Sequence, residues 1–171
     1  NNNSAISAAH TSFNGRLHAE LNAINLSKTN LKNSTIYVTL EPCSHYGKTP
    51  PCTNIIIKKK IKSVVFSVKD PDLRSYDKST NLFKMNRASV KSGILESKCI
   101  NFYRSYFSFK KKKYPFITGK MAISKDFYTA NKKKRWITNI FSRGRAHYLR
   151  STHDCILTSA KTVLIDNLNC E

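Results

Sequence analysis

Two runs of apolar and β-branched residues predict the strands of a sheet. The first, T-I-Y-V-T-L at 35–40, contains no breaker until Pro42, so we expect a buried strand whose carboxyl end presents E-P-C at 41–43. The second is S-V-V-F-S-V at 63–68, which a polar D-P-D turn follows at 70–72. Open α/β sheets bind ligands at the carboxyl ends of their strands, so this edge is where we expect chemistry.

Apolar residues at helical spacing predict two helices beside these strands. One run begins at His18 and continues through Leu21 and Ile24, and a second helix is expected over 53–60 with Cys52 at its start. A helix N-terminus carries partial positive charge and unpaired amides, which stabilise a thiolate against its protonated form. The sequence therefore places two potential metal ligands at the starts of two helices.

The residue types at these positions are those of a catalytic zinc site. Zinc binds thiolate sulfur and imidazole nitrogen in a tetrahedron, and a catalytic zinc keeps three protein ligands so that water takes the fourth position. His18, Cys43 and Cys52 are the predicted ligands. Glu20, two residues after the histidine, is the predicted catalytic residue that carries a proton to the departing amine. The pattern indicates a zinc-dependent deaminase.

The cysteines also have other interpretations. Two cysteines nine positions apart occur as inert core thiols or, in a secreted chain, as a disulfide. No signal peptide or long apolar segment is present, which predicts a cytoplasmic protein and disfavours a disulfide. Cys99, Cys155 and Cys170 lack a partner motif, so we interpret them as structural thiols or bystanders.

The run E-P-C-S-H-Y-G-K-T-P-P-C at 41–52, with H-A-E at 18–20 and V-K-D-P-D at 68–72, closely resembles the deaminase half of the bifunctional RibD family of riboflavin biosynthesis. Editing and salvage deaminases have cysteines only three apart, whereas eight residues separate them here. In the resembled family this insertion, 44–51, shapes the pocket around a phosphoribosylated pyrimidine. The implied substrate is the small molecule 2,5-diamino-6-ribosylamino-4(3H)-pyrimidinone 5′-phosphate, with Zn²⁺ as cofactor.

The resemblance implies two further substrate contacts. Lys48 stands where the family has a Lys or Arg at the sugar phosphate, although a loop lysine is also an ordinary solvated residue. Asp70 matches the family's D-P-N turn but Asp72 replaces its asparagine, and a plain Asx-Pro turn explains both aspartates nearly as well. We interpret His45 as an exposed loop residue or part of the pocket, and not as a metal ligand.

The resemblance continues into the last third of the chain. Y-P-F-I-T-G-K-M-A-I-S at 114–124 is strand-like, and R-W-I-T at 135–138 and the run at 146–166 follow it. Together they resemble the opening of the family's NADPH-dependent reductase domain. The aromatic run at 102–109 and the basic stretch after it correspond to the helix that joins the two domains of the family.

The expected fold is therefore α/β in both parts. The resemblance implies a cytidine-deaminase-like three-layer α/β/α domain at 1–109 and the start of a dihydrofolate-reductase-like α/β domain at 110–171. The first would deaminate the pyrimidine. The second would belong to a reductase that converts the ribose carbonyl form into a ribityl chain.

Matched residue by residue, the reductase resemblance implies one substrate contact and four NADPH contacts. Arg150 corresponds to the substrate contact, although it is also interpretable as a solvated helix residue. The cofactor positions are Ala122, Trp136, Thr162 and Asp166. Trp136 is equally interpretable as a core side chain. The family's S-L-D-G turn ends in Phe127 here, which removes the easy access of glycine to a positive φ.

Both ends of the chain differ from the family pattern. A helix and a first strand with a P-N-P-x-V-G motif are expected before Asn1, and more reductase sheet is expected after Glu171. The resemblance thus predicts an internal piece of a longer enzyme that opens with a turn at 1–3 and a strand at 5–9. A sheet without its first strand would leave one edge unpaired.

Composition adds a competing function. The 30 Lys and Arg against 10 Asp and Glu give a net charge of +20, which would attract nucleic acid, and zinc deaminases that act on bases exist. The basic clusters are short and spread, at 58–60, 110–113 and 132–135, as solvated faces are. The cysteine spacing and the reductase-like tail also argue against a nucleic-acid partner. A degenerate zinc-stabilised relic is a further alternative. A homo-oligomer stays open, and no membrane partner is expected.

Overall fold

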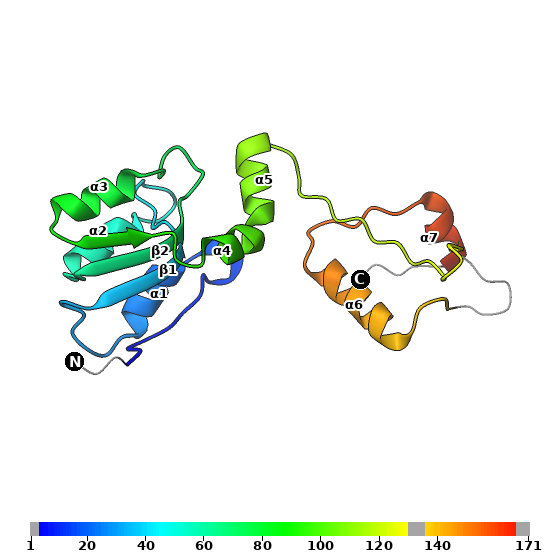
Figure 1. Ribbon diagram of the computed structural model, residues 1–171, viewed down its shortest axis with the longest axis horizontal. Coiled ribbons are helices and arrows are strands. Elements are labelled where there is room, and N and C mark those ends of the chain that lie inside the picture. Colours follow the sequence, from blue (N-terminus) through cyan, green and yellow to red (C-terminus); the bar gives the residue numbers. More distant parts are fainter. Residues whose placement is uncertain (1–3, 130–135, 167–171) are drawn as a thin grey trace. The chain divides into compact units, whose positions relative to one another are not determined.

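The computed structural model describes residues 4–129 and 136–166, the last two without their side chains, and it divides into two compact units (Figure 1). The first unit is Asn1–Phe116 and the second is Ile117–Glu171. The predicted metal ligands all belong to the first unit, and the positions matched to a reductase all belong to the second.

A three-stranded parallel sheet forms the centre of the first unit. Its strands are β1 (Thr35–Leu40), β2 (Ser63–Val68) and β3 (Ser89–Ser92), in the order β1-β2-β3. The strands predicted at 35–40 and 63–68 are therefore confirmed. Because all three run in the same direction, the segments after β1 and β2 meet at one edge, where the Glu41 amide donates to the Val68 carbonyl (2.9 Å).

β1 is not the buried strand that the sequence predicts. Its residues alternate between exposed and half-buried, and Tyr37 is 75% exposed, whereas β2 is buried over 64–68. The difference is positional, since among the described residues β1 is an edge strand and only one of its faces packs into the core. The alternation in T-I-Y-V-T-L is the sequence signal for this one-sided burial.

Three helices pack on one face of the sheet. They are α1 (Ala19–Leu26), α2 (Cys52–Lys58) and α3 (Lys78–Met85), and they enclose a core with the strands. Val64 and Phe66 of β2 and Ile56 and Phe83 of the helices are almost completely buried there. Burying a side chain of this size contributes roughly 1.5–3 kcal/mol. This cluster fixes α2, and with it Cys52, against the strands.

The opposite face of the sheet meets the other helices of the unit. The Ser67 hydroxyl donates to the Ile94 carbonyl just before α4 (Glu96–Phe102), and the Thr39 and Tyr103 hydroxyls are hydrogen-bonded (2.6 Å). α5 (Arg104–Lys112) follows directly and contacts α4. The sheet thus lies between two helical layers, which is the expected three-layer α/β/α arrangement (Figure 1).

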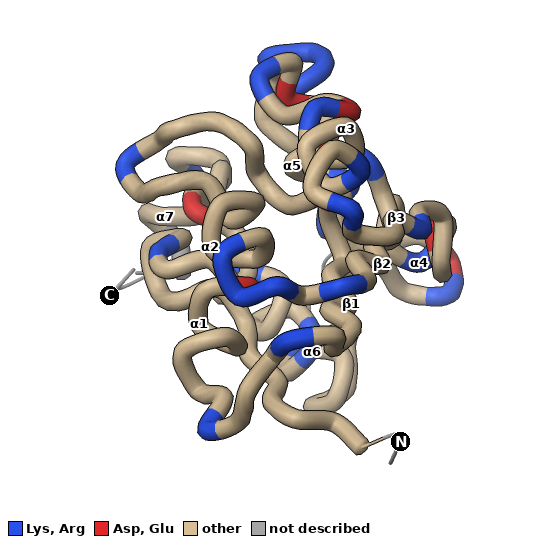
Figure 2. Tube along the Cα trace, turned by 90° about the vertical axis from the view of Figure 1, so that its left-hand side faces the viewer, with Lys and Arg blue, Asp and Glu red and all other residues tan. Residues whose placement is uncertain are grey.

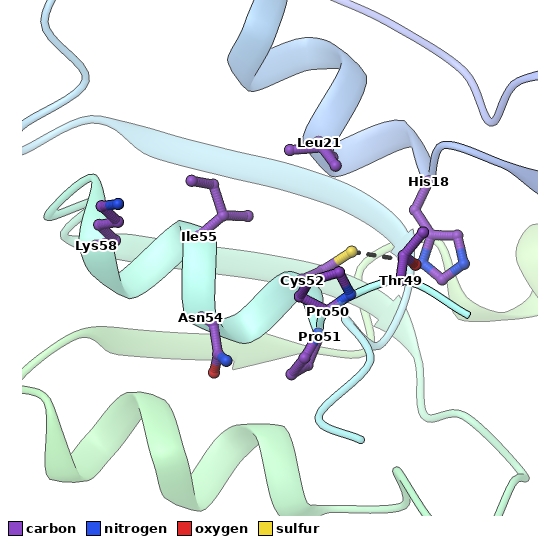
Figure 3. Close-up of a pocket in the computed structure, with 9 residues that line it drawn as sticks. All are labelled: His18, Leu21, Thr49, Pro50, Pro51, Cys52, Asn54, Ile55 and Lys58. Carbon is purple, nitrogen blue, oxygen red and sulfur yellow. Dashed lines mark hydrogen bonds between the residues drawn. The ribbon is translucent and has the colours of Figure 1, made fainter. Parts of the chain in front are cut away.

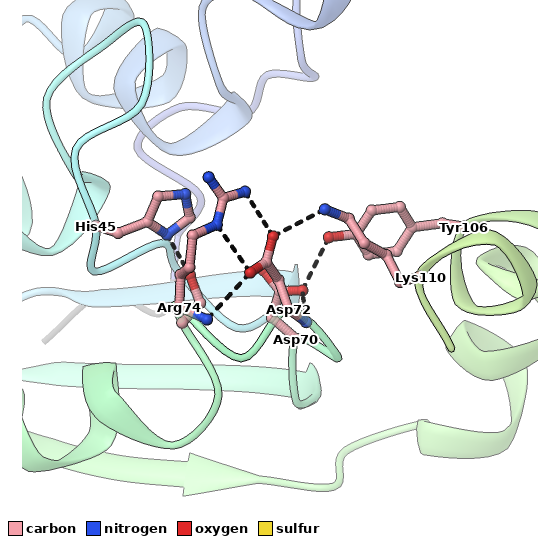
Figure 4. A network of polar contacts seen from close by, with 7 residues as sticks. His45, Asp70, Asp72, Arg74, Tyr106 and Lys110 are labelled. Carbon is pink, nitrogen blue, oxygen red and sulfur yellow. Dashed lines mark hydrogen bonds and ion pairs between the residues drawn. The ribbon is translucent and has the colours of Figure 1, made fainter. Parts of the chain in front are cut away.

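α5 occupies the region expected to hold a joining helix, and it is fastened to the turn after β2 (Figure 4). The Tyr106 hydroxyl donates to Asp70 Oδ1 (2.9 Å), and Lys110 Nζ pairs with Asp72 Oδ2 (2.8 Å). Asp72 also accepts from the exposed Arg74 guanidinium, and this bond and the Lys110 ammonium hold the pKa of Asp72 well below its ordinary value. The network connects the last helix of the unit to the edge of the sheet where Glu41 lies.

Replacing Asp72 by asparagine is expected to lower the free energy of unfolding by about 1 kcal/mol near pH 7, because two cations lose their common partner. The folded-state pKa of Asp72 is depressed, so its contribution is complete above the unfolded pKa of about 4 and is lost as pH falls through the folded value. In urea titrations the difference from wild type should therefore shrink below about pH 4. The exposed Asp154→Asn is the control, and a difference that is independent of pH would contradict this account.

Two predicted strands are wrong. Residues 5–9 and 114–124 form no strand, because a strand needs a neighbour for its backbone hydrogen bonds and no described residue pairs with either segment. The first segment packs along α1 instead, where the Ser7 hydroxyl donates to the Ala23 carbonyl (2.8 Å), and a short 3-10 helix, η1 (Phe13–Gly15), follows. The turn expected at 1–3 lies outside the described residues.

In the described part of the second unit the regular structure is helical. α6 (Ile140–Ser151) begins at Asn139, whose side chain caps the helix by accepting from the Ser142 amide (2.8 Å), and α7 is Ala160–Asp166. Its described residues contain no strand, so the expected opening of a reductase sheet is not seen. In the described parts of the chain no helix combines the length and the apolar character needed to cross a bilayer.

Candidate metal centre and active site

His18, Cys43 and Cys52 come together at the carboxyl edge of the sheet. His18 is the N-cap of α1, Cys43 follows β1, and Cys52 is the first residue of α2. The His18 Nδ1 atom lies 3.5 Å from Cys43 Sγ and 3.4 Å from Cys52 Sγ. All three ligand atoms lie within 4.8 Å of one another. The structure thus assembles the three residues that the sequence predicts as zinc ligands.

These distances fit a zinc ion. With a Zn–N distance of about 2.0 Å and a Zn–S distance of about 2.3 Å, tetrahedral coordination places a nitrogen and a sulfur ligand about 3.5 Å apart. One imidazole and two thiolates are ligands that zinc prefers. Three protein ligands leave one position for water, so the donor set suits a catalytic zinc rather than a closed structural one.

Backbone contacts hold the two cysteines together. The Cys52 amide donates to Cys43 Sγ (3.2 Å), and the Thr53 amide donates to the Cys43 carbonyl (3.2 Å). These are the first amides of α2, which have no acceptor within their own helix and stabilise negative charge on sulfur. The start of α2 therefore both positions Cys43 and favours its thiolate.

Hydrogen bonds inside the group shift the pKa values of the thiols in opposite directions. The bond from the Cys52 thiol lowers the pKa of Cys43 to about 4. The same bond, together with burial, raises the pKa of Cys52, and the bond to Cys43 raises the pKa of His18. The Cys43 thiolate forms readily. Cys52 keeps its proton, which it donates to Cys43, until a metal cation replaces that proton. Metal binding at this site therefore releases protons.

Glu20 lies beside the ligands in the first turn of α1 and is 9% exposed. Burial raises the pKa of its carboxyl group, against the opposing effect of a hydrogen bond to its own backbone. The neighbouring Cys52 thiol has a smaller, lowering effect on the pKa of Glu20. A buried carboxyl group with a raised pKa beside a metal site is suited to take up and release a proton.

A pocket of about 240 Å³ opens beside His18 and Cys52 (Figure 3). Its walls come from α1, α2 and the loop between the two cysteines, and they are mostly apolar. The other lining residues are Leu21, Thr49, Pro50, Pro51, Asn54, Ile55 and Lys58. Glu20 is not among them. A mostly apolar hollow with a few polar groups is the usual form of a small-molecule site.

The loop between the cysteines carries Lys48 and His45. Lys48 is exposed. His45 is half-buried, and its Nδ1 atom lies 2.8 Å from the hydroxyl of the fully buried Ser75 (Figure 4). The expectation of an exposed His45 is thus wrong, because the histidine anchors the loop to the segment that follows the D-P-D turn. Lys48 extends from this anchored loop into solvent.

Asp70, the other substrate contact predicted in this unit, is 6% exposed, and its carboxylate binds the protein itself. Its Oδ1 atom accepts the Asp72 amide (2.9 Å) and the Tyr106 hydroxyl (2.9 Å). The first of these bonds is that of an Asx turn, and the second belongs to the attachment of α5. The observed contacts therefore follow the turn interpretation of D-P-D.

The positions matched to a reductase are spread over the second unit: Ala122 in coil, Arg150 in α6, Thr162 and Asp166 in α7, and Trp136 before α6. Arg150 is exposed on its helix, and the side chain of Asp166 lies outside the described residues. Trp136 is 56% exposed, with the Arg143 guanidinium 4.6 Å from the ring centroid, so the core interpretation of this tryptophan is wrong.

Two residues that the sequence interpretation does not single out hold the site in place. Ser75 anchors His45, and Glu41, which is 2% exposed, accepts three hydrogen bonds from segments far away in the sequence. The signal for Glu41 is its place directly before Pro-Cys at the end of a strand, where a charged residue would otherwise be solvated. No local pattern marks Ser75.

Comparison with known proteins agrees with this geometry. Residues 1–68, which contain the three predicted ligands and Glu20, match the family model of the cytidine and deoxycytidylate deaminase zinc-binding region. Fold and site together define a zinc-binding deaminase domain of the cytidine-deaminase-like α/β class.

The relatives of the chain are riboflavin biosynthesis proteins. It is 38% identical to RibD of Bacillus amyloliquefaciens over 161 residues, which are 93% of this chain and 43% of that protein. It is 33% identical to RibD of Escherichia coli K12 over 155 residues, 90% of this chain and 42% of that one. Over this span the chain is homologous to RibD proteins, and it covers less than half the length of these relatives.

Solved structures give the same assignment. A diaminohydroxyphosphoribosylaminopyrimidine deaminase/5-amino-6-(5-phosphoribosylamino)uracil reductase from Thermotoga maritima matches with a TM-score of 0.87 at 36% identity, covering 95% of this chain and 48% of that one. Acinetobacter baumannii RibD, form 2, matches with a TM-score of 0.87 at 29% identity, covering 98% of this chain and 48% of that one.

Proposed function

We propose that the chain carries the pyrimidine deaminase of riboflavin biosynthesis, acting on 2,5-diamino-6-ribosylamino-4(3H)-pyrimidinone 5′-phosphate. The observation that supports it most directly is the group of His18, Cys43 and Cys52 with Glu20 buried against it. The name of the Thermotoga relative includes the diaminohydroxyphosphoribosylaminopyrimidine deaminase activity, which supports the same substrate class. The proposed ligands are those three residues, and the proposed proton carrier is Glu20.

The reaction is a hydrolysis in which water adds to the ring carbon that bears the amino group, the C–N bond breaks, and a carbonyl and ammonia are formed. Zinc bound by His18, Cys43 and Cys52 would supply a hydroxide nucleophile at neutral pH, because a metal of this kind lowers the pKa of water to about 7. Glu20 holds a proton on its carboxyl group and delivers it to the leaving amino group, so that neutral ammonia departs. Its burial keeps this proton from exchanging directly with bulk water.

Lys48 is the residue that we propose for the substrate phosphate. Its loop begins and ends at the ligands Cys43 and Cys52 and is anchored at His45, so an ammonium on a flexible stem extends from a fixed base. Asp70 is proposed to act on the substrate through the turn that it stabilises, since its carboxylate already binds Asp72 and Tyr106.

The distribution of charge supports a small substrate over a nucleic acid. Figure 2 shows Lys and Arg on several separate elements, among them α2 and α3, and no single element carries them all. The ion pairs among the described residues involve only the 69–77 segment and Lys110. A nucleic-acid site would instead gather its cations along one stripe or face.

Ammonia release tests this function. The zinc-loaded protein should release one molecule of ammonia for each molecule of the phosphoribosyl pyrimidine, and none from single-stranded RNA. Release from RNA alone would contradict the substrate class. One bound zinc with no release from either substrate, in a chain of the full length of the relatives, would favour the zinc-stabilised relic.

For the second part of the chain, we propose that residues 110–171 open an NADPH-dependent reductase that acts on 5-amino-6-(5-phosphoribosylamino)uracil. The name of the Thermotoga relative includes this activity, and the structure divides the chain after Phe116, close to that boundary. Arg150 is proposed for the substrate. Ala122, Trp136, Thr162 and Asp166 are proposed for NADPH.

A further inference from the structure

Glu41 is a buried carboxylate at the junction of β1 and the ligand Cys43. It follows the last residue of β1, and only the buried Pro42 separates it from Cys43. Among the described residues no Lys or Arg lies within ion-pair distance of it. A carboxylate taken out of water without a cation is costly unless hydrogen bonds satisfy its oxygens. We therefore expect hydrogen bonds to both oxygens of the Glu41 carboxylate.

Three donors satisfy the Glu41 carboxylate. Oε2 accepts the amides of Asp70 (3.2 Å) and Asp77 (3.3 Å), and Oε1 accepts the hydroxyl of Ser79 (2.6 Å). Asp70 lies in the turn after β2, whereas Asp77 and Ser79 form the start of α3. One side chain thus joins the end of β1 to two segments that lie 29 to 38 positions further along the chain.

Glu41 also binds the start of α3. Asp77 is the N-cap residue, but its φ of 58° is left-handed and its side chain makes no cap hydrogen bond, because it pairs with Lys69 (2.9 Å). Glu41 accepts from the backbone amide of Asp77 and from the hydroxyl of Ser79 in the first turn. Negative charge at a helix N-terminus is favourable, so the helix and the carboxylate stabilise each other. The position of α3 relative to β1 is set by this contact.

The hydrogen bonds of Glu41 also restrict the position of Cys43. Pro42 has a fixed φ, so displacement of Glu41 moves Cys43 with little freedom between them. From the other side, the first amides of α2 bind the sulfur and the carbonyl of Cys43. Cys43 is therefore held between α2 and the group that Glu41 organises.

We propose that Glu41 is the positioning residue of the metal site. By binding the start of α3 and the turn after β2, it fixes Cys43 at the distances from His18 and Cys52 that a tetrahedral cation requires. The inference rests on the metal site of the proposed function and not on its substrate.

The test compares Glu41→Gln with a matched variant of α3 in the full 171-residue chain. Phe83→Leu shortens a fully buried core side chain and leaves the hydrogen bonds of Glu41 in place. Both variants should lower the Tm. Only Glu41→Gln should raise the apparent Kd for Zn²⁺ in chelator competition, by about 10–100-fold, the range found for groups that orient metal ligands. It should also shift the thiolate charge-transfer band of the Co²⁺-substituted protein.

Three outcomes would overturn the proposal. The first is unchanged zinc affinity and an unchanged Co²⁺ spectrum in Glu41→Gln. The second is an equal rise in Kd in Phe83→Leu at an equal Tm, since the effect would then reflect general instability. If Glu41→Gln does not fold, the apparent Kd for Zn²⁺ is measured in Ser79→Ala instead, because this variant removes the shortest of the three hydrogen bonds to Glu41. A rise in Kd of about 3-fold or more then supports the proposal, and wild-type affinity overturns it.

These measurements use Zn²⁺ and Co²⁺ without substrate. Failure of ammonia release therefore leaves the role of Glu41 standing if the affinities separate as expected. A wild-type chain that binds no zinc would overturn both the proposed function and this inference.

Discussion

Glu20→Gln is expected to keep one equivalent of zinc and to release ammonia from the phosphoribosyl pyrimidine at least ~10²-fold more slowly than the wild type. Glutamine keeps the shape and the hydrogen-bonding capacity of the side chain but cannot carry the proton that the leaving amine needs. Because the position is buried, bulk water cannot readily supply that proton in its place. The measurement pairs elemental analysis with an enzymatic assay for ammonia.

Glu96→Gln is the matched control, since it makes the same chemical change at an exposed position at the start of α4. It should have wild-type zinc content and activity. Substantial turnover in Glu20→Gln would remove Glu20 from the role of proton carrier. Loss of zinc from that variant would show that its carboxylate is needed to assemble the site instead.

Cys52→Ser is expected to reduce the bound zinc from about one equivalent to near zero after dialysis. A serine hydroxyl remains protonated at neutral pH and is a poor zinc ligand, so only two of the three protein ligands would remain. The substitution also removes the thiol that lowers the pKa of Cys43. Both the affinity for the metal and ammonia release should therefore be lost together.

The exposed Cys155→Ser controls for the loss of a thiol as such, and it should leave the zinc content unchanged. Equal zinc stoichiometry in Cys52→Ser and the wild type would refute the ligand assignment. Zinc lost equally from both variants would point to general instability of the chain.

The features predicted correctly from the sequence are those that short-range patterns determine. The runs at 35–40 and 63–68 are strands because consecutive β-branched and apolar residues suit a pleated, buried surface. The approximate starts of α1 and α2 follow from apolar spacing, and they place His18 and Cys52 at helix N-termini. With H-A-E and two cysteines at fixed offsets, these elements were enough to predict which side chains would converge.

The features that were missed or wrong depend on neighbours that no short-range pattern reveals. Residues 114–124 have the composition of a strand, but strand formation requires a partner for the backbone, and none is present among the described residues. The burial of β1 was overestimated because its edge position is a property of the sheet. The roles of Glu41 and Ser75 likewise arise from contacts across about 30 positions or more.

The separation of the ligands along the chain has a consequence for the order in which the first unit comes apart. His18 and Cys52 lie 34 positions apart, so an ion bound to both closes a loop that includes α1 and β1. Closing such a loop restricts the unfolded chain as a cross-link does, and the restriction grows only slowly with loop length. α1 buries only Glu20 and Ile24, so its attachment depends on this closure more than that of α2 does. We therefore expect α1 to detach before α2 when a chelator removes the metal.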